Sequence, residues 1–203
     1  MPLWGTTHGD IDNKPQFLAD DVDSDYDITR SFATNKGWMM RNGAATGNGN
    51  TAADDEVLVA IGGLAGTSAT TGLKQPTITR VRWGQAAYVA ATAITVEVTW
   101  DELVEYDAGT VGTFVITSTG TNITLTATHI DGVAIADELQ GNTVRYSGTT
   151  VDQAATLSIP DNYVLVDPDL KDAVDGVVLP AASKTITAAV KTASGYTTRA
   201  VTT

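Results

Sequence analysis

Apolar and polar residues alternate along much of the chain beyond residue 90, with the period of two that half-buried β-strands show. The segment Ile94–Trp100 has an apolar residue at every second position, with threonine or glutamate between them. In the segment 122–129 the same alternation puts His129 on the apolar face. Further runs of strand length follow at 111–118, 143–146, 155–159, 163–166, 184–190 and 196–201. These short runs, separated by turns, predict an antiparallel β-sandwich of immunoglobulin-domain size over residues 86–203.

The acidic segment 167–176 is the exception, because it is the one stretch in this half of the chain with weak helical character. Before residue 86, strand-length runs occur at 37–41, 56–61 and 77–83. In the last of these, simple alternation predicts Val81 and Trp83 on one face and Ile78 on the opposite face, with the arginines.

In residues 1–35, apolar side chains show no sustained period of 2, as in a strand, or of 3.6, as in a helix. Aromatic residues nevertheless recur along the amino-terminal region, and they are Trp4, Phe17, Tyr26, Phe32 and Trp38. A free tail rarely carries so many aromatic side chains. We therefore expect an arm that lies on its own domain or on a neighbouring molecule, with these five as the candidate partner-binding residues. The chain is thus expected to divide into an amino-terminal arm and docking region, 1–85, and a compact domain, 86–203.

Composition favours the same fold class. The chain has 203 residues, of which 33 are threonine, and valine and isoleucine are frequent. Branching at Cβ suits an extended, half-buried backbone better than a helix. We therefore predict an all-β protein, with an Ig-like antiparallel β-sandwich preceded by an extended arm that carries a few strands.

Residue content also excludes several classes of function. There is no cysteine, which excludes thiol chemistry and disulfides, and there are only two histidines, His8 and His129. The net charge of −12 repels phosphate backbones, so nucleic acid is not an expected partner. No apolar run approaches the roughly 20 residues that cross a bilayer, and no secretory signal is expected at the amino terminus.

Acidic residues suggest metal or acid–base chemistry in three places, and each suggestion is weak. The alternating aspartates at 21, 23, 25 and 27 lack the glycine and glutamate that an EF-hand requires at positions 6 and 12. The aspartates at 167, 169, 172 and 175 have no better spacing, so no metal or other cofactor is expected. We expect Asp101, Glu102, Glu105 and Asp107 in one exposed turn after a strand, which is unsuited to paired-carboxylate catalysis. Neither histidine has a nucleophile motif beside it, so no catalytic residue is assigned.

The opening Met-Pro-Leu-Trp-Gly of residues 1–5, the Asn-Lys-Pro of residues 13–15 and the Gly37-Trp38 pair resemble the start of small virion structural proteins of marine contractile-tailed phages, including cyanophages. The resemblance covers roughly the first 85 residues. It implies a location in the virion and repeated copies, or a homo-oligomer, on the particle. The implied partners are the major capsid protein or other virion proteins.

Residues 94–179 resemble the bacterial Ig-like repeats of surface-layer and adhesive proteins. The segment Val98–Val104 resembles their strand followed by an acidic turn, and residues 144–148 and 157–160 resemble later strands. The usual glycine-rich ending is replaced by Asp172–Gly176, which departs from the pattern. Neither resemblance brings catalytic residues to this chain.

These observations favour a non-enzymatic virion structural protein. The first hypothesis is a capsid decoration or cement protein that docks through its amino-terminal region and projects the Ig-like domain. A tail, neck or fibre component is the alternative within the same class. An adhesive module that binds carbohydrate on a host surface is a different hypothesis, with Tyr88, Tyr106 and Tyr163 as the candidate sugar-contacting residues.

Overall fold

The computed structural model describes residues 30–41, 54–65, 73, 75–107, 109–195 and 197–203. Nearly all of their regular structure is β, which confirms the all-β fold class. The strands are β1 (Phe32–Thr34), β2 (Gly37–Met40), β3 (Glu56–Ala60), β4 (Ile78–Trp83), β5 (Ala87–Val89), β6 (Ala93–Tyr106), β7 (Thr113–Ser118), β8 (Ile123–Ile130), β9 (Val133–Ala134), β10 (Leu139–Thr149), β11 (Ala155–Ser158), β12 (Tyr163–Val164), β13 (Leu170–Asp172), β14 (Thr185–Ile186) and β15 (Thr198–Thr202). The 3-10 helix η3 (Ala181–Lys184) and the short helix α1 (Ala188–Ala193) lie near the carboxyl end.

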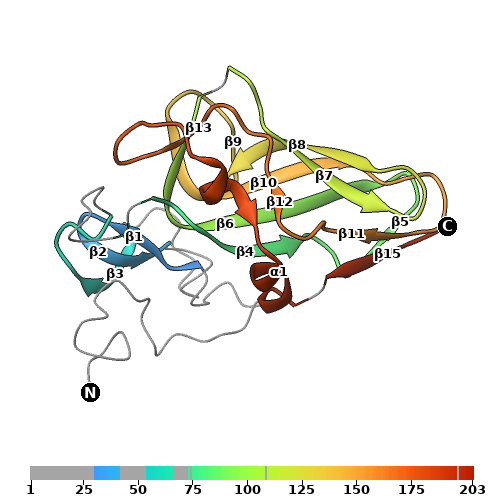
Figure 1. Ribbon diagram of the computed structural model, residues 1–203, viewed down its shortest axis with the longest axis horizontal. Helices are drawn as coiled ribbons and strands as arrows, with labels where there is room; N and C mark the ends of the chain where they lie inside the picture. The colour runs from blue at the N-terminus through green and yellow to red at the C-terminus, as the bar shows by residue number, and fades with distance from the viewer. Residues whose placement is uncertain (1–29, 42–53, 66–72, 74, 108, 196) are drawn as a thin grey trace.

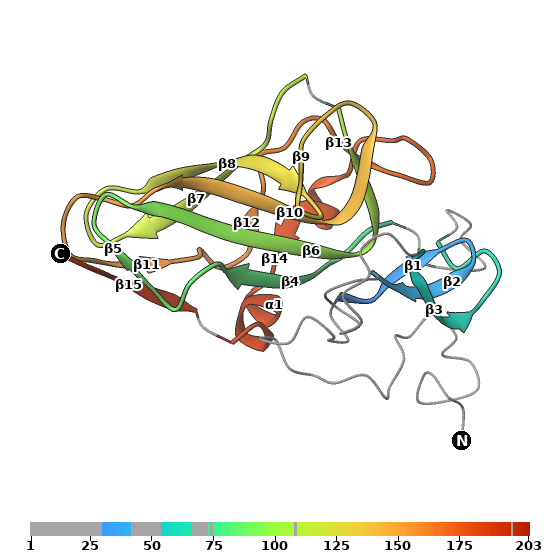
Figure 2. The same cartoon turned by 180° about the vertical axis from the view of Figure 1, so that it is seen from behind.

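The strands form one large mixed sheet and a separate pair, β12–β14. The path through the large sheet is β3-β2-β1-β6-β10-β8-β7-β11-β15-β5, with β4 and β13 also paired to β6 and β9 to β8. Most pairs are antiparallel, but β1–β6 and β5–β15 are parallel. The sheet curls around a main core, which takes side chains from β4–β8, β10, β11, β13 and β15 (Figures 1 and 2). The Ig-like sandwich is therefore not confirmed, although the all-β class is.

Strand β6 is the centre of the sheet. Its predicted inward residues Ile94, Val96, Val98 and Trp100 are all fully buried. The strand does not end at Trp100, as the sequence pattern predicts, but continues to Tyr106. One strand of 14 residues thus contacts β4, β10, β13 and β1, and it links the amino-terminal strands to the main core.

Two β-bulges change which side chains face the core. A register shift between Ile78 and Arg80 in β4 brings Ile78 to the same face as Val81 and Trp83, so the prediction that Ile78 lies opposite them is wrong. In β8, a register shift against β10 moves His129 off the buried face, and Ile130 is buried in its place. An extra residue in one strand reverses the alternation beyond it, which a fixed period of two does not anticipate.

Two segments have a different secondary structure from the one expected. The acidic segment with weak helical character contains strand β13, which pairs with the extended end of β6. The expected strand at 184–190 is divided into the two residues of β14 and helix α1. Thr187 ends the extended backbone there, because its side chain accepts a hydrogen bond from the Val190 N–H and caps the helix.

The amino-terminal strands β1, β2 and β3 lie at one end of the molecule, and the carboxyl terminus lies at the opposite end (Figures 1 and 2). They bury a small second cluster that includes Ala33, Trp38, Leu64 and Ala65. Strand β4 falls before the expected boundary at residues 85/86, but it pairs with β6 and contributes to the main core. The small end sheet therefore consists of β1–β3 alone.

Candidate functional site

The junction between the end sheet β1–β3 and the rest of the molecule is the first candidate region. Strand β1 joins β6 by a parallel pairing between Ala33 and Glu102. The Arg41 guanidinium, just after β2, donates hydrogen bonds to the carboxylates of Asp55, at 2.9 Å, and Asp131, at 2.6 Å. It also stacks 4.9 Å from the ring centroid of Phe32. One arginine thus connects the end sheet with the β8–β9 turn of the main body.

The five aromatic residues predicted to bind a partner have two different outcomes. Phe32 and Trp38 are each 1% exposed and pack within this chain, so their rings are not surface anchors in this structure. Trp4, Phe17 and Tyr26 lie outside the described residues. That these side chains contact a partner stays a prediction.

A groove of about 420 Å³ runs along this junction. One wall comes from β1, β2 and the turn between them, including Met39 and Lys36, and the other comes from Leu103 and from Val174, which follows β13. The exposed surface of its lining is mainly apolar, and the lining also includes the charged residues Lys36 and Asp55. The groove therefore has the character of a surface that accepts an apolar side chain.

Glu102 lies beside this groove and is only 1% exposed. The prediction of an exposed acidic turn here is wrong, because β6 continues through it and the alternation that buries Trp100 also buries Glu102 and Val104. Among the residues that the structure describes, none forms a hydrogen bond with its Oε1. Burial, followed by the nearby charges of Asp101 and Asp172, raises the pKa of Glu102 to about 8. The structure thus places a buried carboxyl group with a raised pKa next to β1.

The segment after β13 turns back on itself as a hairpin. The Asp172 N–H donates to the Val177 carbonyl at 2.9 Å, and the Leu179 N–H donates to the Leu170 carbonyl at 2.9 Å. The Asp172 carboxylate accepts from the Val174 N–H at 2.7 Å, and burial raises the pKa of this carboxyl group. The turn leaves three valines exposed at its tip, Val174, Val177 and Val178. We call residues 173–178 the valine hairpin.

A second buried carboxylate, Asp167, is 1% exposed and lies in the main core. Its Oδ2 accepts hydrogen bonds from the hydroxyls of Tyr106 and of Tyr146, the second at 3.4 Å. The Gly112 N–H donates to the Tyr106 oxygen at 3.2 Å. Burial raises the pKa of Asp167, and burial together with the neighbouring carboxylate raises the pKa of both tyrosines. These groups hold the chain after β12 against β6 and β10.

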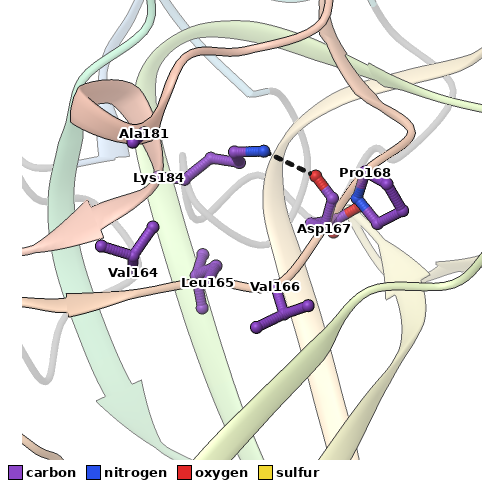
Figure 3. A pocket seen from close by; sticks show the side chains of 7 residues that line it. All are labelled: Val164, Leu165, Val166, Asp167, Pro168, Ala181 and Lys184. Atoms are coloured by element: carbon purple, nitrogen blue, oxygen red, sulfur yellow. Dashed lines mark hydrogen bonds between the residues drawn. The ribbon is translucent and has the colours of Figure 1, made fainter.

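A shallow hollow of about 310 Å³ lies on the outer side of this segment. Figure 3 shows the Lys184 ammonium directed at Asp167, where it donates to the backbone carbonyl oxygen at 2.8 Å. The carboxylate of Asp167 bonds instead to the two core tyrosines, so no acid and base face one another across the hollow. The arrangement fixes the backbone and offers no pair of groups for proton transfer.

The acidic clusters do not assemble into a metal site in the part of the chain described here. Within these residues, no three histidine, cysteine, aspartate or glutamate side chains come close enough to hold an ion. Asp167 and Asp172 are buried in separate networks, and Asp21, Asp23, Asp25 and Asp27 lie outside the described residues. Among the residues that the structure places, no helix is long and apolar enough to cross a bilayer.

The structure also shows how far the residues considered for sugar binding and for acid–base catalysis are buried. Tyr88 and Tyr106 are 2% and 0% exposed, so neither ring is available to stack on a sugar. Tyr163 is half-buried, packs against Phe114 with ring centroids 5.2 Å apart, and accepts from the Val115 N–H. His129 is half-buried, and its Nδ1 lies 3.0 Å from the Thr128 hydroxyl. His8 lies outside the described residues.

The groove, the valine hairpin and the burial of Glu102 were not predicted from the sequence. The signal for Glu102 is present, because the positions 98, 100, 102, 104 and 106 continue one alternation without interruption. The groove has no such signal, since it depends on the segment after β13 lying near β1 and the β1–β2 turn in space. Comparisons with protein-family models, with curated proteins and with solved structures find no match to this chain.

Proposed function

We propose that this chain is a non-enzymatic virion structural protein of the capsid decoration type, which docks through its amino-terminal end and projects its β body from the particle. The resemblance of residues 1–5, 13–15 and 37–38 to phage virion proteins motivates the class. The proposed partner is the major capsid protein or another virion protein, and the proposed location is the virion.

One structural observation supports this orientation. The end sheet β1–β3 lies at one end of the long axis, and the main body extends from it to the carboxyl terminus at the other end (Figure 1). Arg41 fixes the end sheet on the body through Asp55 and Asp131. A docking end that is tied to a preorganised body loses less conformational entropy on binding than a flexible attachment would.

The test is a copy count. Particles encoded by the same genome are purified, and this chain is quantified by mass spectrometry against the major capsid protein. Decoration predicts hundreds of copies per particle. A few copies would assign the chain instead to the tail, neck or fibre, and a chain absent from purified particles would contradict the virion assignment.

A further inference from the structure

We propose that the valine hairpin and the adjoining groove form the surface that binds the shell, and that they bind an apolar side chain surrounded by basic residues on the major capsid protein. This inference rests on the proposed function and names the chemistry of the docking surface. It does not require the five aromatic residues of the amino-terminal region to contact the partner.

Three exposed valine side chains give the hairpin an apolar surface. Val174, Val177 and Val178 are 40%, 55% and 45% exposed, within five consecutive residues. Exposed valines occur elsewhere on the described surface, including the pair Val164 and Val166, but here three are concentrated on one turn. Concentrated apolar surface of this kind marks sites where another molecule binds.

The groove continues this surface. Val174 lines the groove together with Leu103 of β6 and with Met39, which belongs to the end sheet. A partner side chain of leucine or phenylalanine size would be enclosed between the two walls, while the exposed valines would contact the surface around it. Buried anchors within such a hollow contribute most of the affinity of a protein interface.

The hairpin is also held in position before any partner binds. The Ala173 N–H donates to the Leu103 carbonyl at 3.2 Å, which ties the hairpin to β6. Gly176 has φ +69° at the turn, a left-handed conformation that side chains rarely adopt, so the tip can reverse direction in few residues. A preformed turn avoids part of the ordering cost of binding.

The charged residues around the hairpin favour a basic partner surface. Asp175 is at the tip of the hairpin, and Asp169 and Glu105 lie on the neighbouring segments. The nearby Lys171 is paired with Asp107, and Lys36 lies across the groove. The surroundings of the hairpin are therefore net acidic, and the whole chain carries −12. A second copy of this chain would be repelled, whereas a basic surface on the shell would be attracted.

A crosslinking experiment tests the site directly. The chain has no cysteine, so Val177→Cys carries a single photoreactive maleimide label. Val89→Cys is the matched control, because Val89 is 54% exposed but lies on β5, at the other end of the sheet path. Each labelled full-length chain is added to purified shells that lack this protein, irradiated and analysed by mass spectrometry. We expect the label at residue 177, and not the label at residue 89, to crosslink to the major capsid protein.

A binding measurement complements the crosslink. Val177→Lys should weaken binding to the shells at least tenfold, and Val89→Lys should change it less than twofold, with unchanged thermal unfolding of both variants. The milder Val177→Thr keeps the branched shape and should give an intermediate loss. These differences follow from removing apolar contact and adding a charge that a basic partner repels.

The possible results separate the two proposals. A chain that binds shells but crosslinks from residue 89 alone, or binds equally well as Val177→Lys, would overturn the docking surface and leave the virion role intact. A crosslink from residue 177 to a second copy of this chain would overturn the choice of partner. A full-length chain that does not bind shells at all would contradict both proposals.

Discussion

The hydroxyl of Tyr106 on β6 donates a hydrogen bond to the carboxylate of Asp167, which lies 61 residues later in the chain. Tyr146 on β10 donates to the same oxygen at 3.4 Å, and both tyrosines are fully buried. One aspartate thus fixes the segment after β12 against two central strands. Removing one partner from such a buried network lowers the stability of the fold, because the remaining polar groups stay buried without a hydrogen bond.

Asp167→Ala should therefore destabilise the protein strongly. The substitution leaves the two tyrosine hydroxyls buried without their acceptor, and we expect a loss of about 2–4 kcal/mol in the free energy of unfolding. Asp167→Asn keeps an acceptor oxygen and should lose less. Urea denaturation followed by tryptophan fluorescence measures both. Asp152→Ala, at an exposed position, should change stability by less than about 0.5 kcal/mol. Equal losses for the alanine and asparagine variants would show that the hydrogen bonds are not the stabilising interaction.

Gly112→Ala should destabilise the same region through overpacking. A Cβ at residue 112 would collide with the carboxylate of Asp167 and would lie 2.7 Å from the Tyr106 oxygen. Forcing these groups apart costs about 1–3 kcal/mol. Gly62→Ala is the control, because a Cβ there meets nothing within 4 Å. If both variants have the same denaturation midpoint, the close approach at Gly112 is not a constraint on the fold.

Glu102 should make stability depend on pH. Its pKa is raised from an ordinary value near 4.5 to about 8, so the folded protein keeps this proton while the unfolded chain releases it. Below pH 4.5 the group is protonated in both states. As the pH rises from about 4.5 to about 8, the free energy of unfolding falls, by up to about 1.4 kcal/mol per pH unit from this group, and it levels off above that range.

Glu102→Gln removes that ionisation. The variant should therefore be more stable than the parent chain at pH 8–9, and its stability should change less between pH 5 and pH 8. Thermal unfolding across this range in buffers of constant ionic strength measures the difference. Parallel stability profiles for the two chains would mean that Glu102 ionises normally in the folded protein.

Much of the fold was predictable because most strands bury one face. The alternation at 94–100 identifies the inward residues of β6, and the runs predicted at 111–118 and 196–201 overlap the strands β7 and β15. The errors arise where a local feature changes the pattern. A bulge reverses the side-chain order at Ile78, and the Thr187 cap turns an alternating segment into a helix. The groove was not predictable at all, because no periodicity indicates that Val174 and Met39 line the same hollow.

Arg41 should control how firmly the end sheet is attached. Arg41→Met keeps the apolar stem but removes the ion pairs with Asp55 and Asp131, whose side chains are 25% and 18% exposed. We expect faster amide hydrogen exchange across residues 32–40 and a loss of about 1–2 kcal/mol in local stability, with little change in β8 and β10. The control is Arg145→Met, because its ion pair with Glu97 at 3.0 Å lies wholly within the main body. Exchange that accelerates equally in the end sheet and the body would instead make Arg41 part of one cooperative unit.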